Sequence, residues 1–284
     1  MVDEAAPLLA NRTPIRIGGV GLRVRDLERV TSFYRDLIGL QILAQDGGDV
    51  QLGAAGAPLV TLIGDPDAAP APRGSAGLFH TAFLMPTRQD LARWLVHVAR
   101  RKTPLTGFAD HEVSEAVYLD DPEGNGVEVY ADRPPKSWVW RNGTIRMGTD
   151  PLDVDDLVSL GEASEDYRSA PRGLRVGHVH LRVGDVARGE AFYRDALGLQ
   201  ATYRRPDASF LSSGGYHHHI AINAWQSAGA GRRADGQAGL EWLALEVAEP
   251  GILEAQRQRL DFTAVDGGSE ARDPWGTRVR LIRR

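Results

Sequence analysis

The chain has 284 residues, no cysteine and a formal net charge of -5. The lack of cysteine excludes disulfides, thiolate nucleophiles and zinc-thiolate sites, so histidine and carboxylate are the metal ligands to consider. Positive and negative charges are interspersed, which excludes nucleic acid and a membrane surface as partners and favours a small-molecule ligand. Residues 1–13 lack a secretion pattern, and no apolar run nears the ~18 residues needed to span a membrane. We therefore expect a cytoplasmic protein.

The first predicted elements form a short repeating order. Residues 15–24 alternate like a half-buried strand. Asp26 then begins a predicted helix with one apolar face, which Gly39 ends. Short strands follow, separated by glycine and aspartate turn residues, over 41–45, 49–52 and 59–63. The order is therefore strand, helix and three strands.

The same order begins three more times along the chain. The second unit has a strand over 79–85, a helix over 88–100, and strands over 116–119 and 126–130. A third unit starts at Leu174. In the fourth, the predicted elements are a strand over 240–247, a helix over 252–260 and a closing strand over 277–282. The sequence thus predicts four units of about 50 to 60 residues each.

These units are separated by a long connector in the middle of the chain. Residues 14–132 contain two units (14–65 and 76–132), and residues 174–284 contain two more (174–226 and 238–284). The connector, 133–173, is rich in Pro, Gly and Asp and has one short predicted helix over 154–160. A connector of this length can let units from different halves of the chain pack together.

One difference between two near-copies concerns a metal ligand. Residues 19–41 and 177–200 both contain Phe-Tyr-Arg-Asp followed by Gly-Leu-Gln, but His178 stands where the first copy has Gly19. His80 takes the same place at the start of the second unit. On the closing strand of that unit, alternation puts Glu128 opposite two valines. If the valines pack on the helix, Glu128 points into a concavity and needs a partner or a metal; a solvent-exposed face is the alternative.

The four units and these residues resemble the vicinal oxygen chelate (glyoxalase/bleomycin resistance/dioxygenase) superfamily, and within it the type I extradiol ring-cleaving dioxygenases of the catechol 2,3-dioxygenase kind. The resemblance covers nearly the whole chain except its first residues and the connector. It implies an α+β fold in which four βαβββ units pair into cup-shaped mixed sheets. It also implies Fe(II) or Mn(II), held by a His from one unit and a His and a Glu from its partner.

Counting these ligands under each pairing of units selects one cup. Units one and four offer none, because Gly19, Trp242 and Arg280 cannot hold a metal. Units one and two, or three and four, give incomplete sets. Only units two and three give the full set, which is His178, His80 and Glu128. We therefore expect the active cup to straddle the two halves of the chain.

The resemblance assigns further roles. Tyr118 resembles the family tyrosine that hydrogen-bonds a substrate hydroxyl. The segment 110–114 resembles the family Asp-His-x-Val-Ser stretch, with two extra residues before the tyrosine, and makes His111 a substrate-contacting or supporting group; a solvated loop histidine is the alternative. The run His217, His218 and His219 resembles a family segment that carries the acid-base histidine. Matching the following Ile-Ala assigns that role to His218, and strand alternation places its two neighbours on the opposite face.

The function implied is extradiol cleavage of a catechol-like aromatic diol with O2. Two alternatives stay open: a metal-free protein that binds and sequesters an antibiotic-type small molecule, and a glyoxalase-type metal-dependent isomerase or lyase. Enzymes of the glyoxalase type usually bind their metal with more carboxylate ligands than this set contains. A homo-oligomer is a further expectation from the family. The sequence leaves open which diol is the substrate and which of the two metals is bound.

Overall fold

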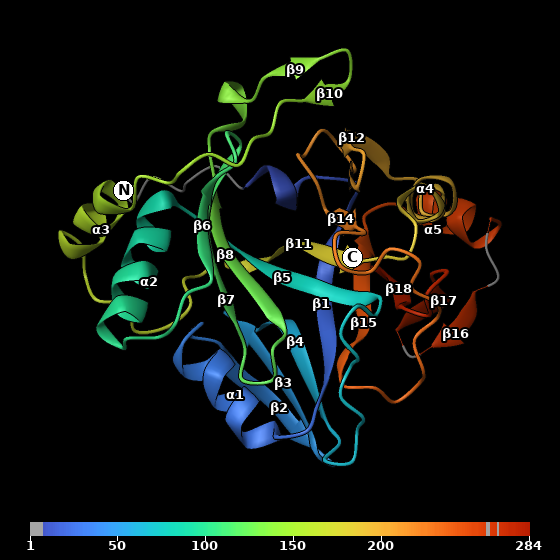
Figure 1. Ribbon diagram of the computed structural model, residues 1–284, viewed down its shortest axis with the longest axis horizontal. Helices are drawn as coiled ribbons and strands as arrows, with labels where there is room; N and C mark the ends of the chain where they lie inside the picture. The colour runs from blue at the N-terminus through green and yellow to red at the C-terminus, as the bar shows by residue number, and fades with distance from the viewer. Residues whose placement is uncertain (1–7, 260–261, 266) are drawn as a thin grey trace.

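A computed structural model describes residues 8–259, 262–265 and 267–284 (Figure 1). Its strands form two eight-stranded sheets and one two-stranded hairpin. The first sheet has the order β16-β17-β18-β15-β1-β4-β3-β2. Its strands are β1 (Ile15–Val24), β2 (Gln41–Asp46), β3 (Asp49–Ala54), β4 (Ala57–Gly64), β15 (Gly239–Val247), β16 (Thr263–Val265), β17 (Gly268–Arg272) and β18 (Arg278–Arg283). This sheet therefore joins the first and fourth units.

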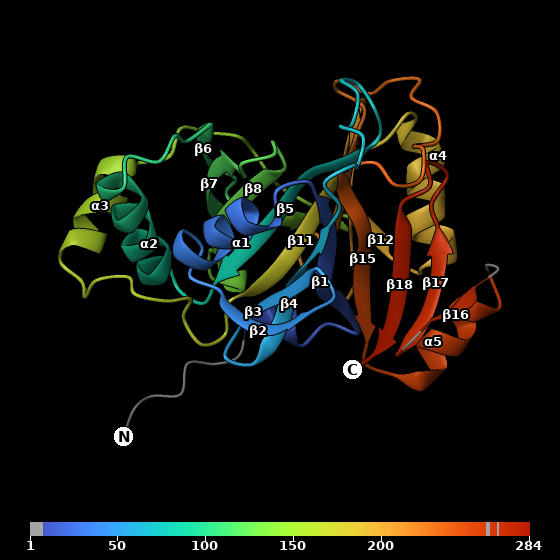
Figure 2. The same ribbon diagram turned by 90° about the horizontal axis from the view of Figure 1, so that it is seen from below.

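The second sheet joins the second and third units and has the order β12-β13-β14-β11-β5-β8-β7-β6. Its strands are β5 (Gly77–Met85), β6 (Gly107–Asp110), β7 (Ser114–Asp120), β8 (Gly126–Asp132), β11 (Arg175–Arg182), β12 (Gln200–Arg205), β13 (Ala208–Ser212) and β14 (Ile220–Asn223). The expected pairing of units across the two halves is thus the one that the strands adopt. Figure 2 shows β1 and β15 of one sheet beside β5 and β11 of the other.

In the second sheet, the pairing of β5 with β11 joins the two halves of the chain in a defined register. Strand β5 pairs antiparallel with β11, and β8 pairs parallel with β5. In this register His180 lies opposite His80, and His178 lies opposite Ala82, which in turn pairs with Glu128. Side chains on one face of paired strands are close neighbours. The pairing alone therefore gathers residues from both halves on one face of the sheet.

Four helical segments pack on the strands of their own units: α1 (Leu27–Asp36), α2 (Arg88–Arg100), α4 (Val186–Ala191), which continues as the π-helical η3 (Phe192–Ala196), and α5 (Pro250–Arg257). The Asp26 side chain caps α1 by accepting from the Arg29 amide, as its sequence position predicts. Helix α5 begins and ends earlier than the predicted 252–260, and residue 260 lies outside the described residues. In the described part of the chain, no helix is long and apolar enough to cross a membrane.

The connector has more structure than its composition predicts. It contains the 3-10 turn η2 (Pro135–Ser137), the hairpin of β9 (Trp140–Arg141) and β10 (Thr144–Ile145), and helix α3 (Val154–Glu162). Only the helix was expected from the sequence. It packs against α2, and the hairpin extends beyond the second sheet (Figure 1). Near the start of the described chain lies a further short turn, η1 (Leu9–Asn11).

Alternation along β8 divides its side chains between two environments. Val127 and Val129 are fully buried in the main hydrophobic core. Burying such a side chain is worth about 1.5–3 kcal/mol. Glu128 and Tyr130 point to the opposite face, where Tyr130 joins a smaller core with Trp138. The predicted direction of Glu128, away from the two valines, is confirmed, and it faces the concave side of the second sheet.

Candidate metal centre

Three side chains meet on the concave side of the second sheet. His80 Nε2 lies 2.9 Å and His178 Nε2 lies 3.2 Å from the same atom, Glu128 Oε2. Their ligand atoms all lie within 4.8 Å of one another, and all three side chains are buried. They come from β5, β8 and β11, and therefore from the second and third units. The structure thus brings together the three residues that the sequence analysis selected as metal ligands.

The arrangement fits a divalent metal better than a protein hydrogen-bond network. His80 Nε2 is buried, and although it lies near Glu128 it has no partner of hydrogen-bond geometry among the described residues. A buried polar atom left unpaired costs free energy, and a metal ion would satisfy it. Two imidazole nitrogens and one carboxylate oxygen are the donor set of metal sites that keep open positions.

The ionisation of these groups also suits metal binding. Burial lowers the pKa of His178 to about 4, so its imidazole is neutral near pH 7. Burial alone raises the pKa of the Glu128 carboxyl, but His178 and His80 outweigh it and hold that pKa well below its ordinary value. A neutral imidazole and an ionised carboxylate are the forms that coordinate metals.

Tyr118 and His111 form a hydrogen-bonded pair beside this centre. His111 Nδ1 lies 2.7 Å from the Gly148 carbonyl, which can only accept, so Nδ1 carries the proton. When the imidazole carries only this proton, its Nε2 accepts from the Tyr118 hydroxyl, 2.7 Å away. Burial and the nearby Glu128 raise the pKa of Tyr118 well above its ordinary value, so the phenol stays protonated. His111 is thus not a solvated loop residue.

Of the three consecutive histidines, His218 faces the cavity and its two neighbours face away, as expected, but strand alternation is not the reason. Strand β14 begins only at Ile220, so the run lies in the loop before it, and its placement inside a strand was wrong. His218 nevertheless lines the cavity of the site. His217 faces Asp132, and His219 faces Thr13 and Ser212, away from that cavity. Burial, reinforced by His178, lowers the pKa of His218 well below its ordinary value.

The centre opens into a cavity of about 410 Å³. Its walls combine the polar residues above with aromatic and apolar side chains, among them Phe79, Phe108, Met147, Tyr203, Phe210 and Trp225. Phe79 and Trp225 contact edge to face, with ring centroids 5.2 Å apart. Trp138, in contrast, is buried in the smaller core and does not line the cavity. A mostly apolar cleft with a few convergent polar groups is typical of a small-molecule site.

His180 also lines this cavity, and the sequence analysis did not select it. The Asn223 side-chain amide donates to His180 Nε2 over 2.9 Å, and its oxygen accepts from the Trp225 amide. Burial lowers the pKa of His180 well below its ordinary value. The signal that could have found it is its spacing, since residues i and i+2 of a strand share a face and His178 precedes it by two.

The corresponding place in the first sheet is filled by other side chains. The Arg280 guanidinium lies 4.4 Å from the centre of the Trp242 ring and pairs with Glu270 at 3.0 Å. A Cβ on Gly21 would come within 2.3 Å of Trp242, so only glycine leaves room for this ring. The first sheet therefore places an arginine and an indole where the second places a carboxylate and an imidazole.

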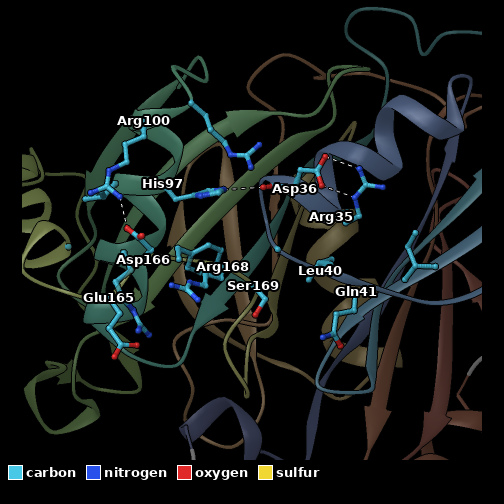
Figure 3. Close-up of a pocket in the computed structure, with 17 residues that line it drawn as sticks. Arg35, Asp36, Leu40, Gln41, His97, Arg100, Glu165, Asp166, Arg168 and Ser169 are labelled. Atoms are coloured by element: carbon cyan, nitrogen blue, oxygen red, sulfur yellow. Dashed lines mark hydrogen bonds and ion pairs between the residues drawn. The ribbon is translucent and has the colours of Figure 1, made fainter.

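A larger cleft of about 820 Å³ lies between α1, α2 and residues 161–169 (Figure 3). Several of its charged side chains form ion pairs with one another: Arg35 pairs with Asp36 at 2.7 Å, and Arg100 pairs with Asp166 at 2.6 Å. His97 contacts the Asp36 carbonyl over 3.0 Å and is half-buried. The convergent donors of the second sheet therefore make the better candidate site.

Comparisons with known proteins agree with the fold and the site. A family model of the Glyoxalase/Bleomycin resistance protein/Dioxygenase superfamily matches residues 16–129 and 175–254. The chain is 38% identical to the catechol-2,3-dioxygenase of Bacillus subtilis (strain 168) in an alignment of 232 residues, which covers 80% of each chain.

Solved structures share the architecture at low identity. A crystal structure from Bacillus subtilis subsp. subtilis str. 168 superposes with a TM-score of 0.65 at 15% identity, over 95% of this chain and 85% of that one. Glyoxalase I from Zea mays superposes with a TM-score of 0.58 at 16% identity, over 96% and 94% of the two chains. The predicted α+β class with cup-shaped mixed sheets is confirmed.

Proposed function

Because the chain belongs to the Glyoxalase/Bleomycin resistance protein/Dioxygenase superfamily, we propose that it is a metal-dependent extradiol dioxygenase that opens the ring of a catechol-like aromatic diol with O2. The observation that carries the proposal is the convergence of two histidines and one glutamate from different halves of the chain at the base of an aromatic-lined cavity. The 38% identity to a catechol-2,3-dioxygenase supports the same reaction.

In this proposal His80, His178 and Glu128 hold Fe(II) or Mn(II). The metal, when bound, supplies open positions at which the diol oxygens and O2 can meet. The protein contributes a neutral imidazole on β11 and an ionised carboxylate on β8, held in place by neighbouring strands of one sheet. Such preorganised ligands fix where the substrate must lie.

The other polar residues of the cavity act on the substrate. His218 accepts a proton from a substrate hydroxyl, since its buried imidazole is neutral at physiological pH. Tyr118 is a protonated phenol and holds a substrate oxygen. His111 accepts the Tyr118 hydrogen bond in the free protein and keeps the phenol pointed into the cavity. Together they surround a bound diol with one base and one donor.

The cavity itself favours a planar aromatic substrate. Phe79, Phe210 and Trp225 present ring faces or edges that can pack against another ring. A volume of about 410 Å³ suits one small aromatic molecule. Trp225 is 43% exposed and so lies where the cavity meets solvent. The ring of the diol would then enter beside Trp225 with its hydroxyls toward Glu128.

The test is oxygen uptake by the metal-loaded, anaerobically purified protein with a panel of catechols. We expect one O2 consumed per diol and a yellow ring-opened semialdehyde product. A metal-loaded protein that consumes no O2 across the panel but isomerises a glutathione hemithioacetal would favour glyoxalase-type chemistry instead. A protein that binds aromatic ligands equally well with and without metal would favour a sequestering function.

A further inference from the structure

A chain of hydrogen bonds runs from behind the cavity to His218. The Asp132 carboxylate, at the end of β8, lies 2.9 Å from His217 Nε2. His217 Nδ1 in turn lies 2.8 Å from His218 Nδ1. All three side chains are at least nine-tenths buried. Water therefore does not compete for these contacts, and each polar atom depends on the partner that the fold provides.

The direction of each hydrogen bond follows from the carboxylate if His217 carries a single proton. An ionised carboxylate can only accept, so His217 Nε2 carries a proton and donates it to Asp132. In a neutral imidazole the other nitrogen then has a lone pair, which makes His217 Nδ1 an acceptor. His218 Nδ1 must therefore carry the proton of the contact between the two rings. The remaining nitrogen, His218 Nε2, is left without a proton.

Asp132 is held in place by a second set of contacts. Its Oδ1 also accepts from the Tyr216 hydroxyl at 3.2 Å, and the Tyr216 oxygen in turn lies 2.8 Å from that of Tyr130. Because Tyr216 donates to the carboxylate, Tyr130 donates to Tyr216. The Tyr216 and His217 rings contact closely, with centroids 4.0 Å apart. Asp132 Oδ1 therefore accepts from both His217 and Tyr216.

We propose that Asp132 is a positioning residue which, through a neutral His217, keeps His218 in the tautomer whose Nε2 can accept a proton from a bound diol. This inference rests on the proposed function. In the proton-transfer step the O–H bond of the substrate breaks, its electron pair stays on oxygen, and the proton bonds to His218 Nε2. The cation formed on His218 is stabilised by His217 Nδ1, with the Asp132 charge behind it. Carboxylate, imidazole and reacting group act in this order in hydrolase triads, where the carboxylate likewise selects the tautomer.

The decisive readout is the tautomer of His218, measured by nitrogen NMR on full-length, histidine-labelled protein in its metal-free form. The His217 and His218 signals are assigned from their absence in His217→Gln and His218→Gln. In the wild type we expect His218 protonated on Nδ1 alone and His217 on Nε2 alone. His218 protonated on Nε2, or His217 protonated on both nitrogens, would overturn the proposal. This measurement needs no turnover and no variant of Asp132.

The variant Asp132→Asn tests the same point through the reaction. Its amide can donate to His217 Nε2, which allows the reversed tautomers. We expect kcat for the diol to fall by about 100-fold or more, with metal content and KM unchanged, together with a new Nε2-protonated His218 signal. The matched control is the same change at Asp36, Asp36→Asn, in the cleft between α1 and α2, which should keep the wild-type tautomers and kcat. An Asp132→Asn protein with the wild-type tautomer and kcat would refute the role. If the wild type turns over no diol, the proposed function fails while the tautomer result still stands.

Discussion

His178 Nε2 and Glu128 Oε2 lie 3.2 Å apart, although 50 residues and the whole connector separate them in the chain. The contact exists because β11 and β8 flank β5 in one sheet. Neither half of the chain contains the complete ligand set. The metal content of single variants therefore reports directly on the pairing of the two halves.

We expect about one divalent metal ion per chain in anaerobically purified protein, and its loss in both His80→Ala and His178→Ala. Each variant removes one of three protein donors, and a site with two donors holds a divalent ion far more weakly. Elemental analysis after gel filtration measures this. The matched control is His97→Ala, in the cleft between α1 and α2, which should keep its metal. Metal retained in His178→Ala but lost in His80→Ala would show that the third unit contributes no ligand.

Tyr118→Phe should raise KM for the diol by about tenfold, because one hydrogen bond to the substrate oxygen, worth about 1–1.5 kcal/mol, is lost. The metal content should not change, since the phenol is not among the three convergent donors. Steady-state oxygen uptake gives KM and kcat. Tyr167→Phe is the control, since Tyr167 donates to the Ile38 carbonyl at the other cleft. An unchanged KM in Tyr118→Phe would remove the tyrosine from substrate binding.

Gly126→Ala should lower the free energy of unfolding by about 1–3 kcal/mol. A Cβ at this position would lie 2.1 Å from the Phe79 carbonyl oxygen, and this backbone atom cannot move without disturbing the pairing of β8 with β5. Gly251→Ala, in α5, meets nothing within 4 Å and should gain about 0.5–1 kcal/mol as a helical alanine. Urea unfolding of both variants measures the difference. Equal stabilities would mean that β8 can shift freely away from β5.

The stability of the chain should depend on pH through Asp121. Burial raises the pKa of this carboxyl from 3.8 to about 6, against hydrogen bonds from Asn125 and Glu123. A raised folded-state pKa means that the folded protein binds this proton more tightly than the unfolded chain. Its contribution to stability is therefore largest below about pH 4 and is lost as pH rises through about 6. A shift of this size corresponds to roughly 3 kcal/mol.

The variant Asp121→Asn isolates this effect. Its amide has no charged form, so the stability difference between variant and wild type should move in favour of the variant by roughly 2 kcal/mol between pH 4 and pH 7. Urea unfolding at several pH values gives the two curves. A difference that stays constant with pH would show that the Asp121 carboxyl has the same pKa in the folded and unfolded chain.

Local patterns in the sequence predicted the repeated elements and the direction of the main ligands. The two-residue period of a strand is enough to place Glu128 opposite Val127 and Val129, and the repeat is enough to equate His178 with His80. The pairing of units followed from the ligand set that the family resemblance implies, because an arginine and an indole cannot supply it. The first two inferences need only neighbours in sequence or equivalent positions in a repeat.

Other features depend on contacts that no local pattern contains. The link from Asp132 to His217 joins residues 85 apart and depends on how β8 and the loop before β14 come together. The β9–β10 hairpin has only two residues in each strand, too few for a period to show. The histidine run was taken for strand because Ile220 continues it, but two glycines with positive φ, Gly214 and Gly215, bring the chain into β14 through a turn.

The interleaved sheets also limit the order in which the protein can form during synthesis. Strand β1 emerges first but lies beside β15, and β5 lies beside β11, so neither sheet can close before the second half of the chain is made. Until then β1 and β5 expose unpaired backbone groups, which invite pairing with other chains. We therefore expect the amino-terminal half, expressed alone, to aggregate, and the sheet of β1 to be completed only after β18 has left the ribosome.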